Sequence, residues 1–260
     1  AGDGIPNIHG GNGEPGGHRS SSSASTRSVF GAHPDVLMIA EESTAWPKVT
    51  YPVSDGAWAS TSSEHGWMND ICHYIKMDPY FRQFNHRDIT FSLVYAFSEN
   101  YILPLLPRRG GPHEGSFFGK MPGDNPMKFA GVRVFYTYML AHPGKKLTFM
   151  GAELAQWNEW HYEYSLDWHL LQYEPHRQTQ EFFKAANAFY LEQPALWEQD
   201  DSWQASSGCA PMTTRPTLSP SSAGTRRQPP AGSVQLLSGT PEGYRVGPLR
   251  RDVVRCAEHR

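Results

Sequence analysis

Cysteine is scarce in this 260-residue chain, and its three cysteines have no paired spacing. Cys72, Cys209 and Cys256 lie too far apart for a zinc motif, and three residues do not build a disulfide framework. Neither a metal nor another cofactor is expected. No apolar run approaches the ~20 residues that span a bilayer, and the first residues lack the apolar core of a signal peptide. The sequence therefore predicts a cytoplasmic protein that does not contact a membrane.

A strong charge of either sign is also absent, because the net charge is only −3 at pH 7. Nucleic acids and anionic membrane surfaces attract strongly basic proteins, so neither is expected as a partner. Hydrophobic residues make up 38% of the chain, which is low for a well-buried protein of this length. Part of the chain is therefore expected to remain without a packed core.

Aromatic residues are abundant by contrast, at 13% of the chain with eight tryptophans. Aromatic rings fill protein cores, and their flat apolar faces also pack against the pyranose rings of sugars in binding clefts. Core packing is the preferred interpretation for most of them.

One apolar run ends at a pair of carboxylates. Val36 to Ala40 is continuously apolar, and Glu41 and Glu42 follow it directly. A strand that is buried on both faces of a parallel sheet has this pattern. In a (β/α) barrel the chemistry takes place at the carboxyl ends of such strands. The stretch alone leaves two interpretations open, a catalytic carboxylate and an ordinary surface pair.

Strand and helix patterns alternate along the chain, which indicates a parallel α/β sheet. Further buried strands are predicted at Tyr101–Leu105 and Leu147–Gly151. Helices are predicted at about 67–77, 129–140 and 176–191 from their apolar spacing, and 89–97 suits either a helix or a strand.

Two polar stretches interrupt this alternation. Residues 13–28 have the composition of a flexible linker, and residues 205–232 that of a disordered tail. Both are predicted to lack regular structure and to pack poorly. Short strands at 234–237 and 243–246 suggest a small β module.

Several blocks occur in an order that resembles the bacterial 1,4-α-glucan (glycogen) branching enzymes of the α-amylase superfamily. The blocks are Met38 to Pro47, Gly66 to Asp70, Gly119 to Asp124, His142 to Lys146, Phe149 to Gly151 with Gln156-Trp157, and Ser165 to His169. The resemblance implies a partial (β/α)8 TIM barrel, with the last four strand–helix units in residues 1–200. The start of an all-β C-terminal domain, largely disordered, would follow in residues 201–260. Half a barrel would leave open sheet edges and an exposed apolar face.

The resemblance also implies retaining glycosyl transfer for glycogen biosynthesis, with an α-1,4-glucan as substrate and an α-1,6 branch as product. Glu41 matches the catalytic acid/base, and Glu42 is interpreted as a supporting residue. Such a general acid needs a raised pKa, which partial burial and a nearby negative charge supply. Trp157 and Trp160 are predicted to bind the substrate.

This sequence departs from the family pattern at two catalytic positions. The nucleophile of the family is an aspartate on the fourth barrel strand, and the resemblance places it outside these 260 residues. A third carboxylate belongs to a Ser-His-Asp-Glu-Val-Val-His block, but the equivalent stretch, 106–114, places Arg108 where the aspartate belongs. A guanidinium reverses the charge and removes the hydrogen-bond acceptor. The chain by itself is therefore expected to be inactive.

A shift of reading frame accounts for the altered block. Written with GC-rich codons and read one base early, the family block translates as residues 106–112 without a mismatch. A similar shift generates Pro15 to Arg19 within the 13–28 stretch. Residues 57–65, 205–232 and 248–260 have the same character. Frame errors, decay of the gene and real divergence all remain open as explanations.

Two other functions are compatible with the sequence. One is an amylase-type hydrolase, although the Gln156-Trp157 and Ser165 to His169 blocks favour a branching enzyme. The other is a non-catalytic glucan-binding remnant that uses Trp157, Trp160 and Trp168.

Overall fold

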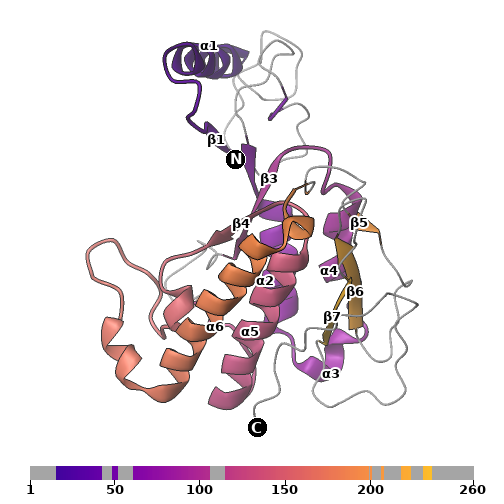
Figure 1. Cartoon of the computed structure of the whole chain (residues 1–260), viewed down its shortest axis with the longest axis vertical. Helices are drawn as coiled ribbons and strands as arrows, with labels where there is room; N and C mark the ends of the chain where they lie inside the picture. The colour runs from indigo at the N-terminus through magenta and orange to yellow at the C-terminus, as the bar shows by residue number, and fades with distance from the viewer. Residues whose placement is uncertain are drawn as a thin grey trace, which may run out of the picture. The chain divides into compact units, whose positions relative to one another are not determined.

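The structure is a computed structural model that describes residues 16–42, 49–51, 61–105, 115–198, 200, 206–207, 218–223 and 231–235. Side chains are described for 24–40, 49–51, 66–105, 115–198 and 200. The chain divides into two compact units (Figure 1). Unit 1 contains Ala1–Glu64 and Ser98–Ile102, and unit 2 contains His65–Phe97 and Leu103–Arg260.

Parallel pairing joins the first three strands of the larger sheet. β1 (Ile39–Glu42) pairs in parallel with β2 (Thr61–Glu64), and β2 pairs in parallel with the start of β3 (Tyr101–Leu105). The sheet order is β1-β2-β3-β4, with β4 at Lys145–Thr148. The predicted parallel arrangement of the strands at β1 and β3 is confirmed. The sequence did not predict β2, because Thr-Ser-Ser-Glu has no apolar residue and the strand exists through its two neighbours.

The prediction of a buried strand at Val36 to Ala40 is wrong in position and in burial. β1 starts only at Ile39 and includes both glutamates. Val36, Leu37 and Ile39 are 41%, 71% and 58% exposed. A strand is buried on both faces only where other elements pack on both. Among the described residues β1 is the first strand in the sheet order and pairs with β2 alone, which leaves apolar surface exposed, as expected of an incomplete barrel.

Residues 13–28 were predicted to be a linker, and this is wrong because α1 (Gly16–Ala32) is a regular helix. No proline interrupts 16–32, and serine is only moderately unfavourable in a helix. Between 24 and 32, Thr26 is buried while the other side chains are half-buried or exposed. The helix α1 is thus regular although few of its described side chains are buried.

Three helices predicted from their apolar spacing surround the core of unit 2. They are α2 (His65–Lys76), α5 (Asn125–Ala141) and α6 (Glu174–Glu192), and α5 packs along α6 (Figure 1). The largest fully buried side chains include Trp67, Tyr74, Phe118, Phe135 and Tyr136. Burial of these aromatic and aliphatic faces is the main stabilising contribution, at roughly 25 cal/mol per Å².

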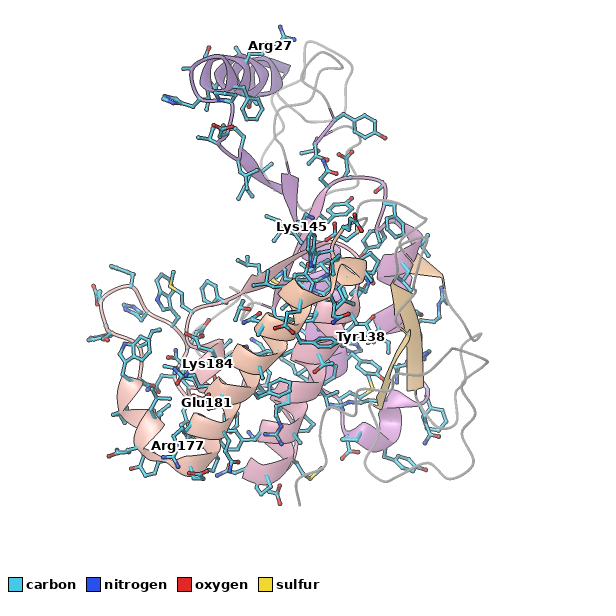
Figure 2. All side chains as sticks on the ribbon, in the orientation of Figure 1. Arg27, Tyr138, Lys145, Arg177, Glu181 and Lys184 are labelled. Atoms are coloured by element: carbon cyan, nitrogen blue, oxygen red, sulfur yellow. The ribbon has the colours of Figure 1, made fainter. Side chains whose placement is uncertain are left out.

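The solvent face of α6 is charged. Figure 2 shows Arg177, Glu181 and Lys184 along this helix. The Lys184 ammonium lies 2.6 Å from the Glu181 carboxylate, and Arg177 pairs with Glu174. Exposed pairs of this spacing contribute only a few tenths of a kcal/mol each, about 0.2–0.5, so the helix depends on its buried face.

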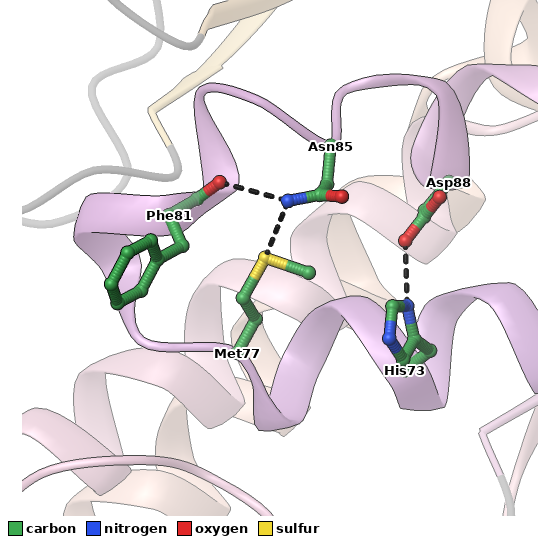
Figure 3. A network of polar contacts seen from close by, with 5 residues as sticks. All are labelled: His73, Met77, Phe81, Asn85 and Asp88. Carbon is green, nitrogen blue, oxygen red and sulfur yellow. Dashed lines mark hydrogen bonds and ion pairs between the residues drawn. The ribbon is translucent and has the colours of Figure 1, made fainter.

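Short helices connect α2 to β3, namely α3 (Pro79–Arg82), α4 (Arg87–Thr90) and the 3-10 helix η2 (Phe91–Val94). The ambiguous stretch 89–97 is therefore helical where it is regular. In Figure 3 the amide of Asn85 donates to the Phe81 carbonyl oxygen at 3.1 Å and to the Met77 sulfur at 3.2 Å. Nδ1 of His73 lies 2.7 Å from Asp88 Oδ2, which joins α2 to α4.

Two further predictions are corrected in unit 2. The strand predicted as buried at Leu147–Gly151 is β4, which starts earlier and has exposed Lys145, Leu147 and Thr148 side chains. β4 is the last strand in the sheet order, so the described residues give it a strand neighbour on one side only.

The predicted absence of regular structure in 205–232 is also wrong at three places. β5 (Ser206–Ser207), β6 (Leu218–Ala223) and β7 (Ala231–Gln235) pair as an antiparallel sheet. β7 overlaps the strand predicted at 234–237, whereas the strand predicted at 243–246 lies outside the described residues. None of the described helices is long and apolar enough to cross a membrane.

Candidate functional site

Glu41 and Glu42 stand at the carboxyl end of a parallel strand. They are the last two residues of β1, in register with Ser63 and Glu64 of β2. Ser63 is in register with Ile102 of β3 in turn. The backbone therefore carries both glutamates to the edge of the sheet where parallel-sheet enzymes place their chemistry. Their side chains lie outside the described residues, so their roles stay predictions.

The block 106–114, which contains Arg108, follows the carboxyl end of β3 in sequence. It lies outside the described residues, as do 43–48 after β1. The proposed replacement of a family carboxylate by Arg108 therefore stays a prediction from the sequence.

An open hollow lies in unit 2. Its lining is mostly apolar and comes from the end of β3, the segment before α5 and the loop after β4. The lining residues are Leu105, Ser116, Phe117, Phe118, Phe149, Met150, Gly151, Ala152, Gln156 and Trp160. The polar side-chain groups of this lining are the Ser116 hydroxyl, the Gln156 amide and the Trp160 indole N–H. Apolar walls with a few convergent polar groups are typical of ligand sites.

The two tryptophans predicted to bind substrate lie at this hollow or beside it. Trp160 lines the hollow and packs edge-on against Phe149, with ring centroids 5.6 Å apart. Trp157 packs edge-on against Phe118 at 4.6 Å and is 44% exposed. Trp168, the third tryptophan considered, is 52% exposed and does not line the hollow.

A tight turn leads from β4 to these tryptophans. Gly151 and Ala155 have left-handed backbones, with φ of 84° and 49°, on either side of the 3-10 helix η3 (Ala152–Leu154). Glycine adopts this conformation at little cost, whereas a residue with a Cβ is strained there. Nδ1 of the buried His176, in the first turn of α6, donates to the Leu154 carbonyl oxygen at 2.7 Å. The helix thereby holds the turn in place.

Phe118, Ser116, Gly151 and Gln156 were not predicted from the sequence to be site residues. The available signals were a glycine at the end of a predicted strand and the Gln-Trp dipeptide. No sequence pattern predicted the contact of Phe118 with Trp157, because this contact depends on how segments distant in the chain pack together. Among the described side chains, no group of three or more His, Cys, Asp or Glu residues could hold a metal ion.

Comparison with curated proteins gives long matches at high identity. The 1,4-alpha-glucan branching enzymes GlgB of Thermosynechococcus vestitus and Aquifex aeolicus are each 49% identical to this chain, over 173 and 174 residues. A branching enzyme of Rhizobium etli is 44% identical over 200 residues, or 76% of this chain. Over these residues the chain is homologous to bacterial 1,4-α-glucan branching enzymes. The resemblance predicted from the sequence blocks is thus confirmed.

The branching-enzyme homology covers a limited part of each relative. The matches to the Thermosynechococcus and Aquifex enzymes span 66% of this chain, and 23% and 28% of those enzymes. The longer Rhizobium match spans 27% of that enzyme. The chain therefore corresponds to about a quarter of the length of these relatives. No protein-family model matches the chain.

Solved structures similar to this one are α-amylase-type enzymes. The α-amylase of Geobacillus thermoleovorans gives a TM-score of 0.57 over 85% of this chain and 46% of its own, at 9% identity. The cyclic α-maltosyl-(1→6)-maltose hydrolase of Arthrobacter globiformis gives 0.58 over 84% and 46%, at 10% identity. At these identities the likeness concerns the fold alone. It supports an α-amylase-type fold, which is consistent with the partial (β/α)8 barrel predicted from the sequence.

Proposed function

We propose that this chain is the C-terminal part of the catalytic barrel of a 1,4-α-glucan branching enzyme, followed by the start of an all-β domain. The observation that carries the proposal is 49% identity over 173 residues. The parallel strands β1 to β3 and the antiparallel strands β5 to β7 support this proposal. The boundary between the two proposed domains, 1–200 and 201–260, stays a prediction, because the compact units of the structure divide the chain at other positions. A cytoplasmic location stays a prediction from the sequence.

In the proposed reaction an α-1,4-linked chain is cleaved and transferred to a 6-hydroxyl. Glu41 acts as general acid and protonates the leaving glucosyl oxygen while a carboxylate nucleophile, ~5 Å away in retaining enzymes, attacks the anomeric carbon. The Glu41 carboxylate then removes the proton from an acceptor 6-hydroxyl, which displaces the nucleophile and forms the α-1,6 branch. Glu42 has the supporting role, and the nucleophile is supplied by a segment outside these 260 residues.

The substrate proposed for this site is an α-1,4-glucan. Ring faces of Trp157 and Trp160 would pack against the apolar faces of glucose units, as aromatic side chains commonly do with flat apolar surfaces. The mostly apolar hollow beside them supports this choice. Among the proteins of similar fold, AmyP has been solved in complex with maltotriose, at a TM-score of 0.60 and 10% identity.

Iodine staining of amylose tests the proposed reaction, because branching lowers the absorbance of the iodine complex. The purified chain is expected to cause no fall. We expect a fall in absorbance with a hybrid protein that adds the upstream barrel half of a relative. The hybrid also has the family sequence restored at 106–114 and at the other aberrant stretches. Glu41→Gln in the hybrid should reduce the rate by several orders of magnitude.

Two outcomes contradict the proposal. Branching by the unmodified chain that is lost on Glu41→Gln would place the nucleophile within these residues. Release of reducing sugar by the hybrid without new branches would identify an amylase-type hydrolase instead.

Glucan binding is tested separately, by retardation of the chain in a native gel that contains glycogen. Trp157→Ala and Trp160→Ala are expected to reduce retardation. Phe189→Ala, which removes a ring from the far end of α6, serves as the control. Equal retardation of all variants would contradict the proposed roles of the two tryptophans.

A further inference from the structure

Gln156 is a buried polar residue between the turn after β4 and the aromatic loop. Its side chain is 5% exposed. Nε2 donates to the Asn158 carbonyl oxygen at 3.0 Å, and Oε1 accepts from the Asp167 backbone N–H at 3.5 Å. Both ends of the amide therefore meet a complementary partner, which accounts for the burial of the group.

A second contact reinforces this arrangement. The side-chain amide of Asn158 donates to Asp167 Oδ2 at 3.0 Å. Gln156 and Asn158 on one side and Asp167 on the other thus join the two ends of the segment 157–166. We call these three residues the amide clamp. The segment that the clamp closes is part of the salmon loop at the left of Figure 1.

Aromatic side chains fill the closed segment, which we call the aromatic loop. Trp157 and Trp160 contact Phe118 and Phe149 at the hollow. The other rings belong to His161, Tyr162 and Tyr164, and the two tyrosines are 76% and 73% exposed. Exposed rings contribute little packing to hold the segment in shape. The clamp at its base and the contacts of the two tryptophans with Phe118 and Phe149 therefore hold the loop.

Gly151 provides the space for the Gln156 amide. A Cβ added at Gly151 would lie 2.2 Å from Gln156 Cδ and 2.3 Å from Oε1. The Gln156 backbone N–H also donates to the Gly151 carbonyl oxygen at 3.3 Å. A side chain at position 151 would thus displace the amide, besides being strained at a φ of 84°.

We propose that Gln156 is a positioning residue for glucan binding, since its amide fixes the aromatic loop with Trp157 on Phe118 and Trp160 at the hollow. The inference rests on the proposed function, whose substrate these tryptophans contact. A loop that is already ordered binds more tightly because less conformational entropy is lost on binding. Glutamate cannot replace Gln156, because it loses the donor to Asn158 and adds a negative charge near the Asp167 carboxylate. Alanine loses both bonds.

Two readouts on the full chain test this role. One is the dissociation constant for glycogen from native gels, and the other is the rate of chymotryptic cleavage within 157–166, mapped by mass spectrometry. Gln156→Ala and Gln156→Glu are expected to weaken binding about tenfold or more and to speed cleavage of the loop similarly. Circular dichroism should stay unchanged. Gln178→Ala, which removes an exposed glutamine from α6, is the matched control and should alter neither readout.

Gly151→Ala gives a second test, because its Cβ displaces the amide without removing it, besides straining the turn. It should weaken binding and speed loop cleavage as Gln156→Ala does. Loop cleavage that is unchanged in both variants, or glycogen binding as tight as that of the unsubstituted chain, would overturn the positioning role. An unsubstituted chain that glycogen does not retard would instead overturn the proposed glucan binding, while loop cleavage still reports on the clamp.

Discussion

Nε2 of His142 lies 2.8 Å from the hydroxyl oxygen of Ser92, 50 positions earlier in the chain, and both residues are buried. Nδ1 of the same ring lies 2.8 Å from the Pro143 carbonyl oxygen, which can only accept, so Nδ1 donates. Ser92 therefore donates its hydroxyl hydrogen to Nε2, and the ring is neutral. The indole of Trp67 covers the ring at 4.4 Å between centroids.

We expect the stability of the protein to fall below pH 6.5 because of His142. Burial lowers the pKa of its imidazole to about 3, from an ordinary value of 6.5. Between these two values the unfolded chain binds a proton that the folded chain does not. The free energy of unfolding should therefore decrease with falling pH, by up to about 1.4 kcal/mol per pH unit. Urea unfolding between pH 4 and 7 measures the slope, and His142→Asn should flatten it. An equal slope in both proteins would contradict the prediction.

Lys146 should make the protein more stable as pH rises above 7. Its ammonium donates to the Gly144 carbonyl oxygen at 2.6 Å and to that of His142, and lies 5.7 Å from the Tyr190 ring centroid. Burial lowers the pKa of Lys146 to about 7, from 10.5. Above pH 7 the folded chain releases a proton that the unfolded chain keeps up to its own pKa, so unfolding becomes less favourable. Comparing urea midpoints at pH 7.5 and 9.5 checks this, and Lys146→Met should abolish the increase.

Phe183 and Phe189 form a matched pair on α6. Phe183 is 3% exposed and stacks on Tyr136 with ring centroids 3.9 Å apart, whereas Phe189 is 38% exposed. Phe183→Ala should lower the free energy of unfolding by about 3–5 kcal/mol, because it leaves a cavity in the core. Phe189→Ala should cost less than about 1 kcal/mol. Chemical denaturation of the two variants tests the difference, and similar losses would contradict the described packing of α6.

Asp124 caps the first turn of α5. Its backbone is extended, and its Oδ1 accepts from the Met127 backbone N–H at 3.0 Å. Asp124→Ala removes the acceptor and should destabilise the protein by about 0.5–2 kcal/mol, whereas Asp124→Asn keeps an acceptor and should cost little. Thermal unfolding of both variants measures this. A larger loss in the asparagine variant than in the alanine variant would show that the carboxylate charge, and not the cap, is what matters.

The helices of unit 2 were predictable because their information is local. In α6, Phe182, Ala186 and Tyr190 recur at helical spacing, and the structure packs these side chains partly buried against the core. The ordered blocks from Met38 to His169 likewise predicted the branching-enzyme homology, since identity is carried by the residues themselves and needs no tertiary contact.

The strands and the serine-rich helix depended on context. The apolar run Val36 to Ala40 has the pattern of a buried strand, yet Leu37 before β1 and Ile39 within it are exposed. Burial requires elements packed on both faces of the strand. β2 has no strand pattern and forms by pairing between β1 and β3. α1 forms where composition favoured a linker, since intrinsic propensities differ by less than 1 kcal/mol per residue, about 0.7 at most for ordinary residues.

The sequence by itself determined which chemical groups are present: the Glu41-Glu42 pair at the end of a strand in unit 1, and the aromatic residues around Gln156 in unit 2. Only the tertiary structure decided which of them meet. Phe118 lies against Trp157, Gln156 bonds across the loop to Asp167, and Gly151 leaves room for the amide. Such contacts join segments whose separation in the chain carries no periodic signal, so they follow from how the elements pack and not from local propensity.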